Sequence, residues 1–126
     1  MLFGEEDFIL KWSEVSRFWN EKFGKSPDLN AILFLIGIRE VGTLKQEFKK
    51  EEKMDLMHVA ICRILMPSGY YTLEGHDQDG WPVYTQVRDI PSVDLFTQER
   101  LLKEHVIQYF EDEQLFSEDA ISADIS

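Results

Sequence analysis

The chain has 126 residues, most simply one domain that can bury a core without disulfides or a metal. Hydrophobic residues make up 44% and aromatic residues 13%, which excludes wholesale disorder. The net charge of −11 disfavours nucleic-acid binding, because phosphate backbones would repel the chain.

The start of the chain and its cysteine usage indicate a location. The opening MLFGEEDF carries acids where a secretory signal would need bases. The longest apolar run, Ala31 to Ile38, falls far short of the roughly 20 residues that span a bilayer. Cys62 stands alone and suits a reducing compartment. We therefore expect a cytoplasmic protein that does not bind membranes.

The first element is an amphipathic helix over residues 5–23. Its apolar residues recur at steps of four and three, which places them on one side. They are Phe8, Trp12, Val15, Trp19 and Phe23. Gly24 can supply the left-handed residue that ends the helix. We expect this stripe to be core.

The second element is a helix from Pro27 to Val41. Ser26 as N-cap and Pro27 in the first turn form a strong start signal, and Gly42 is a natural stop. The stretch from Leu29 to Ile38 is apolar nearly all round, so this should be the central, buried helix.

A third helix is predicted over residues 51–65. Thr43 with Gln46 resembles a capping box that opens a short helical turn before it. The apolar phase of that turn does not continue, so one straight helix is excluded. Pro67 and Gly69 follow as stop signals. The residues expected to face inward are Met54, Met57, Ile61, Ile64 and Leu65.

From Tyr70 to Arg88 the hydrophobic period changes from 3.6 towards 2, which predicts an antiparallel hairpin. A three-residue loop over 78–80 pairs Gly75 with Val83, Leu73 with Thr85 and Tyr71 with Val87. This register collects apolar residues on one face, which a two-residue loop would mix. That face should pack on helices. Gly80 stands where the loop requires a left-handed residue.

The hairpin tip, EGHDQDGW, also carries candidate metal ligands in His76, Asp77 and Asp79. An EF-hand is excluded because Gly75 and Gln86 would occupy its two anchor positions. Turn geometry explains the tip, with a carboxylate–imidazole site as the alternative. We expect no cofactor.

Other candidate binding residues are Arg39, Glu40, His58, Trp81 and Tyr84. If Arg39 and Glu40 are buried, they need partners; otherwise they meet solvent at the helix end. His58 and Cys62 stand four apart, a spacing that can present two ligands to one metal. The alternative is a boundary histidine beside a small buried cysteine.

The last helix is predicted over residues 97–112, capped by Ser92 or Thr97. We expect His105 on its flank. Its apolar side consists of Leu101, Leu102, Val106, Tyr109 and Phe110. Residues 111–126 hold six acids and no Lys or Arg, which is typical of a disordered tail or of a segment that folds on a partner. Leu115 and Phe116 could instead dock on this chain or on a second copy.

The predicted fold class is α+β, mainly helical, with about four helices and one antiparallel hairpin before the last helix. Residues 1–110 should form one compact domain and residues 111–126 an acidic tail. No nucleophile elbow, Walker A loop, Rossmann glycine run or zinc motif is present, which removes positive evidence for catalysis.

The composition favours a non-catalytic interaction or assembly module that self-associates or binds a protein partner. We expect self-association through the hairpin or through the aromatic stripe of the helix over residues 5–23. The alternative is a small metal-dependent or ligand-binding enzyme with a histidine–carboxylate pocket. The first requires an apolar surface patch, and the second requires those groups to converge.

Overall fold

The computed structural model of the chain describes residues 2–43, 45–91 and 94–116. Within these residues the chain forms four α-helices and one antiparallel hairpin that precedes the last helix, so the mainly helical α+β fold is confirmed. Contacts divide the chain into two compact units. We call Met1–Asp28 with Ser92–Ser126 the terminal unit and Leu29–Pro91 the central unit.

Helix α1, Glu5–Phe23, has the predicted bounds. Gly24 ends it with a φ of +73°, and its N–H donates to the Asn20 carbonyl over 2.7 Å. Val15 and Trp19 are buried, while Phe8 and Trp12 are half-buried. The predicted stripe therefore faces into the protein along most of its length.

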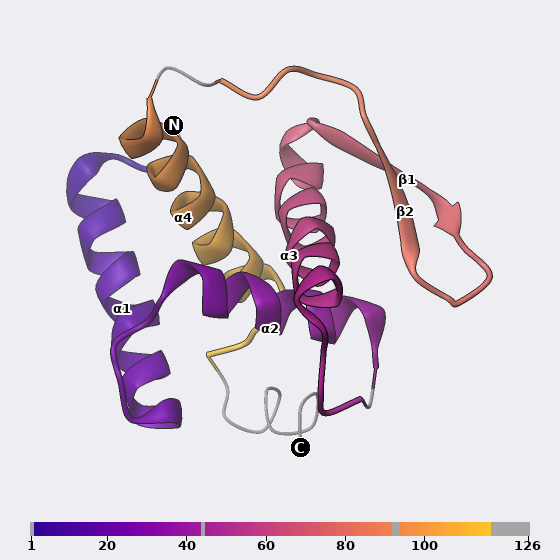
Figure 1. The fold of residues 1–126 in the computed structure, drawn as a ribbon. Coiled ribbons are helices and arrows are strands. Elements are labelled where there is room, and N and C mark those ends of the chain that lie inside the picture. Colours follow the sequence, from indigo (N-terminus) through magenta and orange to yellow (C-terminus); the bar gives the residue numbers. More distant parts are fainter. Residues whose placement is uncertain (1, 44, 92–93, 117–126) are drawn as a thin grey trace. The chain divides into compact units, whose positions relative to one another are not determined.

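Helix α4, Leu95–Asp112, lies beside α1 in the terminal unit (Figure 1). It begins two residues earlier than predicted because the Asp94 carboxylate caps it, accepting the Thr97 N–H over 2.7 Å. Of the two predicted caps, Thr97 lies inside the helix and Ser92 lies outside the described residues.

The chain turns at the end of α4, where the Leu115 N–H donates to the Phe110 carbonyl over 2.9 Å. Leu115 is buried, and residues 111–112 still belong to α4. The acidic segment that was predicted to start at residue 111 therefore begins within the last turn of α4. Residues 117–126 lie outside the described residues, and the tail stays a prediction there.

In the central unit, α2 spans Leu29–Val41, two residues shorter at its start than predicted. Ile32, Leu33 and Ile36 are buried, as the apolar run requires. Gly42 ends the helix with a φ of +75°. Residues 45–49 are not helical, so the predicted turn of helix after Thr43 is wrong. The Thr43 hydroxyl accepts the Lys45 N–H instead.

Helix α3, Lys50–Leu65, begins one residue before the predicted start. Ile64 and Leu65 are buried as predicted, but the inward side differs near the start of the helix, where Leu56 is buried and Met54 is 61% exposed. Two residues correspond to about 200° around a helix, so these side chains point to opposite sides. The buried side chains are Leu56, Val59, Ala60, Cys62, Ile64 and Leu65. A short 3₁₀ helix, Met66–Ser68, follows.

Helices α2 and α3 approach closely at Gly37. A Cβ atom added there would lie 2.1 Å from the carbonyl oxygen of Leu56. Such an approach is possible only without a side chain at this position, so Gly37 sets the distance between the two helices.

The hairpin consists of β1, Tyr71–His76, and β2, Pro82–Gln86. The three-residue loop is confirmed at its base, where the Asp77 N–H donates to the Trp81 carbonyl over 2.9 Å. Gly75 pairs with Val83 as predicted. Gly80 has a φ of +84°, the left-handed conformation that the loop needs.

Further from the tip, the register shifts between Leu73 and Gly75. Leu73 pairs with Tyr84 and Tyr71 with Gln86, so the predicted pairs with Thr85 and Val87 are wrong. The extra residue, Glu74, forms a bulge, and a one-residue slip reverses the side-chain faces of β2 relative to β1.

The bulge also overturns the predicted buried face of the hairpin. Leu73, Val83 and Val87 are 46%, 42% and 56% exposed. Tyr71 is buried as predicted, and Tyr84, which was expected on the other face, is half-buried. Val83 now lies on the face opposite Tyr84, together with Thr72 and Thr85. We call Thr72, Val83, Thr85 and Val87 the open face of the hairpin.

Replacing Gly37 with alanine tests the close approach of α2 and α3. Gly37→Ala should lower the free energy of unfolding by about 1–3 kcal/mol, because its methyl group forces the helices apart. Urea denaturation would measure the change. Gly4→Ala is the matched control, since a Cβ there meets nothing within 4 Å. Equal stability of the two variants would contradict the contact.

Candidate functional site

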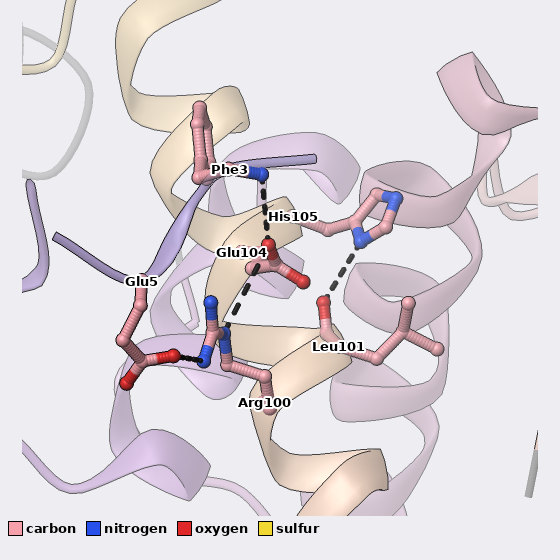
Figure 2. A network of polar contacts seen from close by, with 6 residues as sticks. All are labelled: Phe3, Glu5, Arg100, Leu101, Glu104 and His105. Carbon is pink, nitrogen blue, oxygen red and sulfur yellow. Dashed lines mark hydrogen bonds and ion pairs between the residues drawn. The ribbon is translucent and has the colours of Figure 1, made fainter. Parts of the chain in front are cut away.

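A buried polar network in the terminal unit centres on Glu104 of α4 (Figure 2). One carboxylate oxygen, Oε2, accepts the N–H of Phe3 over 3.0 Å and lies 3.9 Å from Nε of Arg100. Arg100 also contacts Glu5 through Nη1 at 2.8 Å and stacks on the Phe8 ring at 3.8 Å. The network joins the start of the chain to α4.

The hydrogen-bonding capacity of this network is incompletely used. Within the described residues, Glu104 Oε1 and the Nε and Nη2 atoms of Arg100 are buried without a hydrogen-bond partner. Gln108 Oε1 is a further such atom. These residues recur every four positions along α4, so the pattern places them on one side of the helix. The i,i+4 spacing was visible in the sequence, but burial was not.

His105 is buried, so its predicted place on a helix flank is wrong. The neighbouring residues Val106, Ile107 and Tyr109 are buried too, which leaves this part of α4 no exposed flank. The ring nitrogen Nδ1 lies 2.8 Å from the Leu101 carbonyl oxygen. Burial lowers the pKa of His105 below its ordinary value of 6.5, because the charged imidazolium loses hydration.

In the central unit, the predicted candidates Arg39 and Glu40 are half-buried at the end of α2. Glu40 Oε2 lies 3.6 Å from Nη1 of Arg39, and Glu40 Oε1 lies 3.3 Å from Nε of Arg63 on α3. The carboxylate is thus held between two guanidinium groups. Arg63 is the partner that sequence reasoning missed, because the pairing depends on how α2 and α3 cross.

Three groups near this ion pair are held in their protonated forms at neutral pH. Burial raises the pKa of Cys62 to about 11, although a hydrogen bond with Tyr71 opposes the shift. Burial also raises the pKa of Tyr84, and the charge of Glu40 adds to the effect. Burial likewise raises the pKa of Tyr71. A protonated, buried thiol is a poor nucleophile and a poor metal ligand.

The predicted ligand pair His58 and Cys62 is close, with 3.6 Å between His58 Nε2 and Cys62 Sγ. His58 itself is exposed. In residues 2–43, 45–91 and 94–116, no group of three or more His, Cys, Asp or Glu side chains is placed to hold a metal ion. The arrangement therefore offers two potential ligands without a third.

At the hairpin tip, the Asp77 carboxylate stabilises the turn. Its Oδ1 accepts the N–H groups of Asp79 and Trp81 over 2.9 and 3.0 Å. His76 and Asp79 are exposed, and Trp81 is half-buried. Asp77 thus has a structural role that requires no metal.

A pocket of about 380 Å³ lies between α1 and the segment that follows α4 in the terminal unit. It is lined by Glu14, Arg17, Phe18, Glu21 and Phe116, none of which sequence reasoning proposed as a site. Phe18 lies outside the regular stripe of α1, which was the one available signal. Exposed Leu95 and Phe96 begin α4 in the same unit.

The chain matches no protein-family model, no curated protein and no solved structure. No helix within the described part of the chain has the length and apolar character needed to cross a membrane.

The Glu104 network can be tested by removing its buried charge. Glu104→Gln should lower the free energy of unfolding by about 3 kcal/mol, because Arg100 loses its buried counter-charge. The control is Glu99→Gln, which removes an exposed ion pair with Lys103 worth about 1 kcal/mol or less. Chemical denaturation would measure both, and equal losses would refute a special role for the buried pair.

The lowered pKa of His105 predicts a pH dependence of stability. Below pH 6.5 the unfolded chain takes up a proton on this ring while the folded protein does not. The contribution of neutral His105 to the free energy of unfolding should therefore be fully present above pH 6.5. It should be lost as the pH decreases towards the lower folded-state pKa. His105→Gln should flatten this part of a melting-temperature profile, whereas His58→Gln controls for loss of an exposed histidine. An unchanged slope in His105→Gln would contradict the assignment.

Proposed function

We propose that the protein is a non-catalytic assembly module that self-associates through the open face of its hairpin. The observation that carries the proposal is the exposure of the two valines, Val83 and Val87, on this face, whereas exposed Leu73 pairs with Tyr84 on the opposite face. Apolar residues gathered on one exposed surface favour a contact with another protein, because burying them removes apolar area from water.

The edges of the hairpin support the same proposal. Within the described residues, β1 and β2 each have one strand neighbour, so each presents an outer edge. Edge strands offer unpaired backbone groups that can extend a sheet with another chain. Pro82 lacks an N–H, so strand addition is favoured along β1 rather than at the start of β2.

The packing of α1 favours the hairpin over α1 as the dimerisation surface. The aromatic stripe of α1 was the other predicted dimerisation surface, but Val15 and Trp19 are buried within the protein. The chemistry of the central unit also favours binding over catalysis, because the buried thiol of Cys62 is a poor nucleophile and Glu40 is paired with arginines. The enzyme alternative would need its histidines to join carboxylates in one pocket.

Sedimentation equilibrium of the full chain at increasing concentration tests self-association. The wild type should form dimers, and Val83→Lys should weaken dimerisation by about tenfold or more, because burying a lysine in the interface removes its hydration. Met54→Lys is the matched control, since it makes the same kind of change at an exposed position on α3 of the same unit. A wild type that stays monomeric, or equal effects of both variants, would overturn the proposal.

A further inference from the structure

The pocket on α1 is built from an aromatic cluster and a charged rim. Phe110 is buried, and its ring centroid lies 6.0 Å from Phe18 and 5.7 Å from Phe116. Phe18 and Phe116 are themselves 6.1 Å apart in an edge-to-face arrangement. The turn after α4 that buries Leu115 thus returns Phe116 to α1, and the pocket has aromatic walls held by a buried ring.

The rim of the pocket is charged and exposed. Glu14, Arg17 and Glu21 all line it from α1. Steps of three and four residues place them on one side of the helix, and Leu10, which is 62% exposed, precedes them on the same side. The local charge is −1 in a chain of net charge −11. Arg17 opposes the acids that flank it.

We propose that this pocket receives a lysine or arginine side chain from a basic segment of a partner protein. Aromatic rings attract cations placed against them, and carboxylates bind ammonium and guanidinium groups with charge-assisted hydrogen bonds. Exposed Leu10 supplies an apolar contact for a neighbouring aliphatic residue of the same segment. Charge complementarity therefore selects a basic, amphipathic partner.

This inference goes beyond self-association and does not depend on it. The pocket lies in the terminal unit, whereas the hairpin lies in the central unit. A chain that fails to dimerise can still bind a basic segment, and the two measurements use different variants.

The test measures binding of a fluorescein-labelled model peptide with lysine and leucine at helical spacing, by fluorescence anisotropy with the full chain. At about 0.15 M salt, long-range attraction to the acidic chain is screened. Glu14→Gln/Glu21→Gln should weaken binding about fivefold or more, and Arg17→Gln should strengthen it about twofold or more. The opposite signs follow from attraction and repulsion of the same bound cation.

Two further variants separate the pocket from general charge attraction. Glu47→Gln/Glu51→Gln removes the same charge at exposed positions of the central unit and should change affinity less than about twofold. Phe116→Leu keeps an apolar side chain but removes the ring, and should weaken binding about twofold or more at constant charge. Circular dichroism would verify that each variant is folded.

Weaker binding by the Glu14/Glu21 and Phe116 variants, with stronger binding by Arg17→Gln, supports it. Equal weakening by the two double variants, or no gain with Arg17→Gln, would show attraction to net charge alone and overturn it. Tight binding of a control peptide with glutamate in place of lysine would overturn it as well.

Discussion

The backbone contact between Gly37 and Leu56 is the constraint on which the central unit depends. It allows α2 and α3 to approach more closely than any side chain at position 37 would permit. The same helix pair brings Glu40 of α2 within 3.3 Å of Arg63 of α3. Because only the short 3₁₀ helix separates α3 from the hairpin, Tyr84 comes under the influence of both charges. A side chain at position 37 would therefore disturb the ion pair and the environment of the hairpin together.

The terminal unit is joined by a different kind of interaction. Buried charge links residues about 100 positions apart in the chain, through the Glu104 contact with the Phe3 N–H and the Arg100 contact with Glu5. A buried ion pair is weak evidence for stability, since desolvation offsets much of its attraction, but it disfavours arrangements in which either charge is left alone. It thus specifies which part of α4 the start of the chain contacts, whereas the aromatic cluster of Phe18, Phe110 and Phe116 supplies apolar contact.

The two proposed surfaces differ in their physical character. The open face of the hairpin presents valine and threonine side chains, with the Glu74 carboxylate accepting the Thr72 hydroxyl beside them, and suits a symmetric contact between identical chains. The α1 pocket combines rings with net negative charge and suits a basic partner. Burial raises the pKa of the Cys62 thiol to about 11, which disfavours thiol chemistry at neutral pH. The two regions best suited to binding are therefore the open face of the hairpin and the α1 pocket.

The sequence by itself determined the features that depend on neighbouring residues. The bounds of α1, the stop at Gly42, and the loop ending at Gly80 follow from local periodicity and from the left-handed conformation that glycine adopts readily. The sequence also singled out Arg39 and Glu40 as charges that would need partners. Tertiary structure alone decided that Arg63 is one of them, because that contact joins two helices. It also decided the bulge at Glu74, the exposure of Met54 and the burial of His105. Each of these depends on which side of an element another segment covers, and a chain's local pattern does not encode that when several of its sides are apolar.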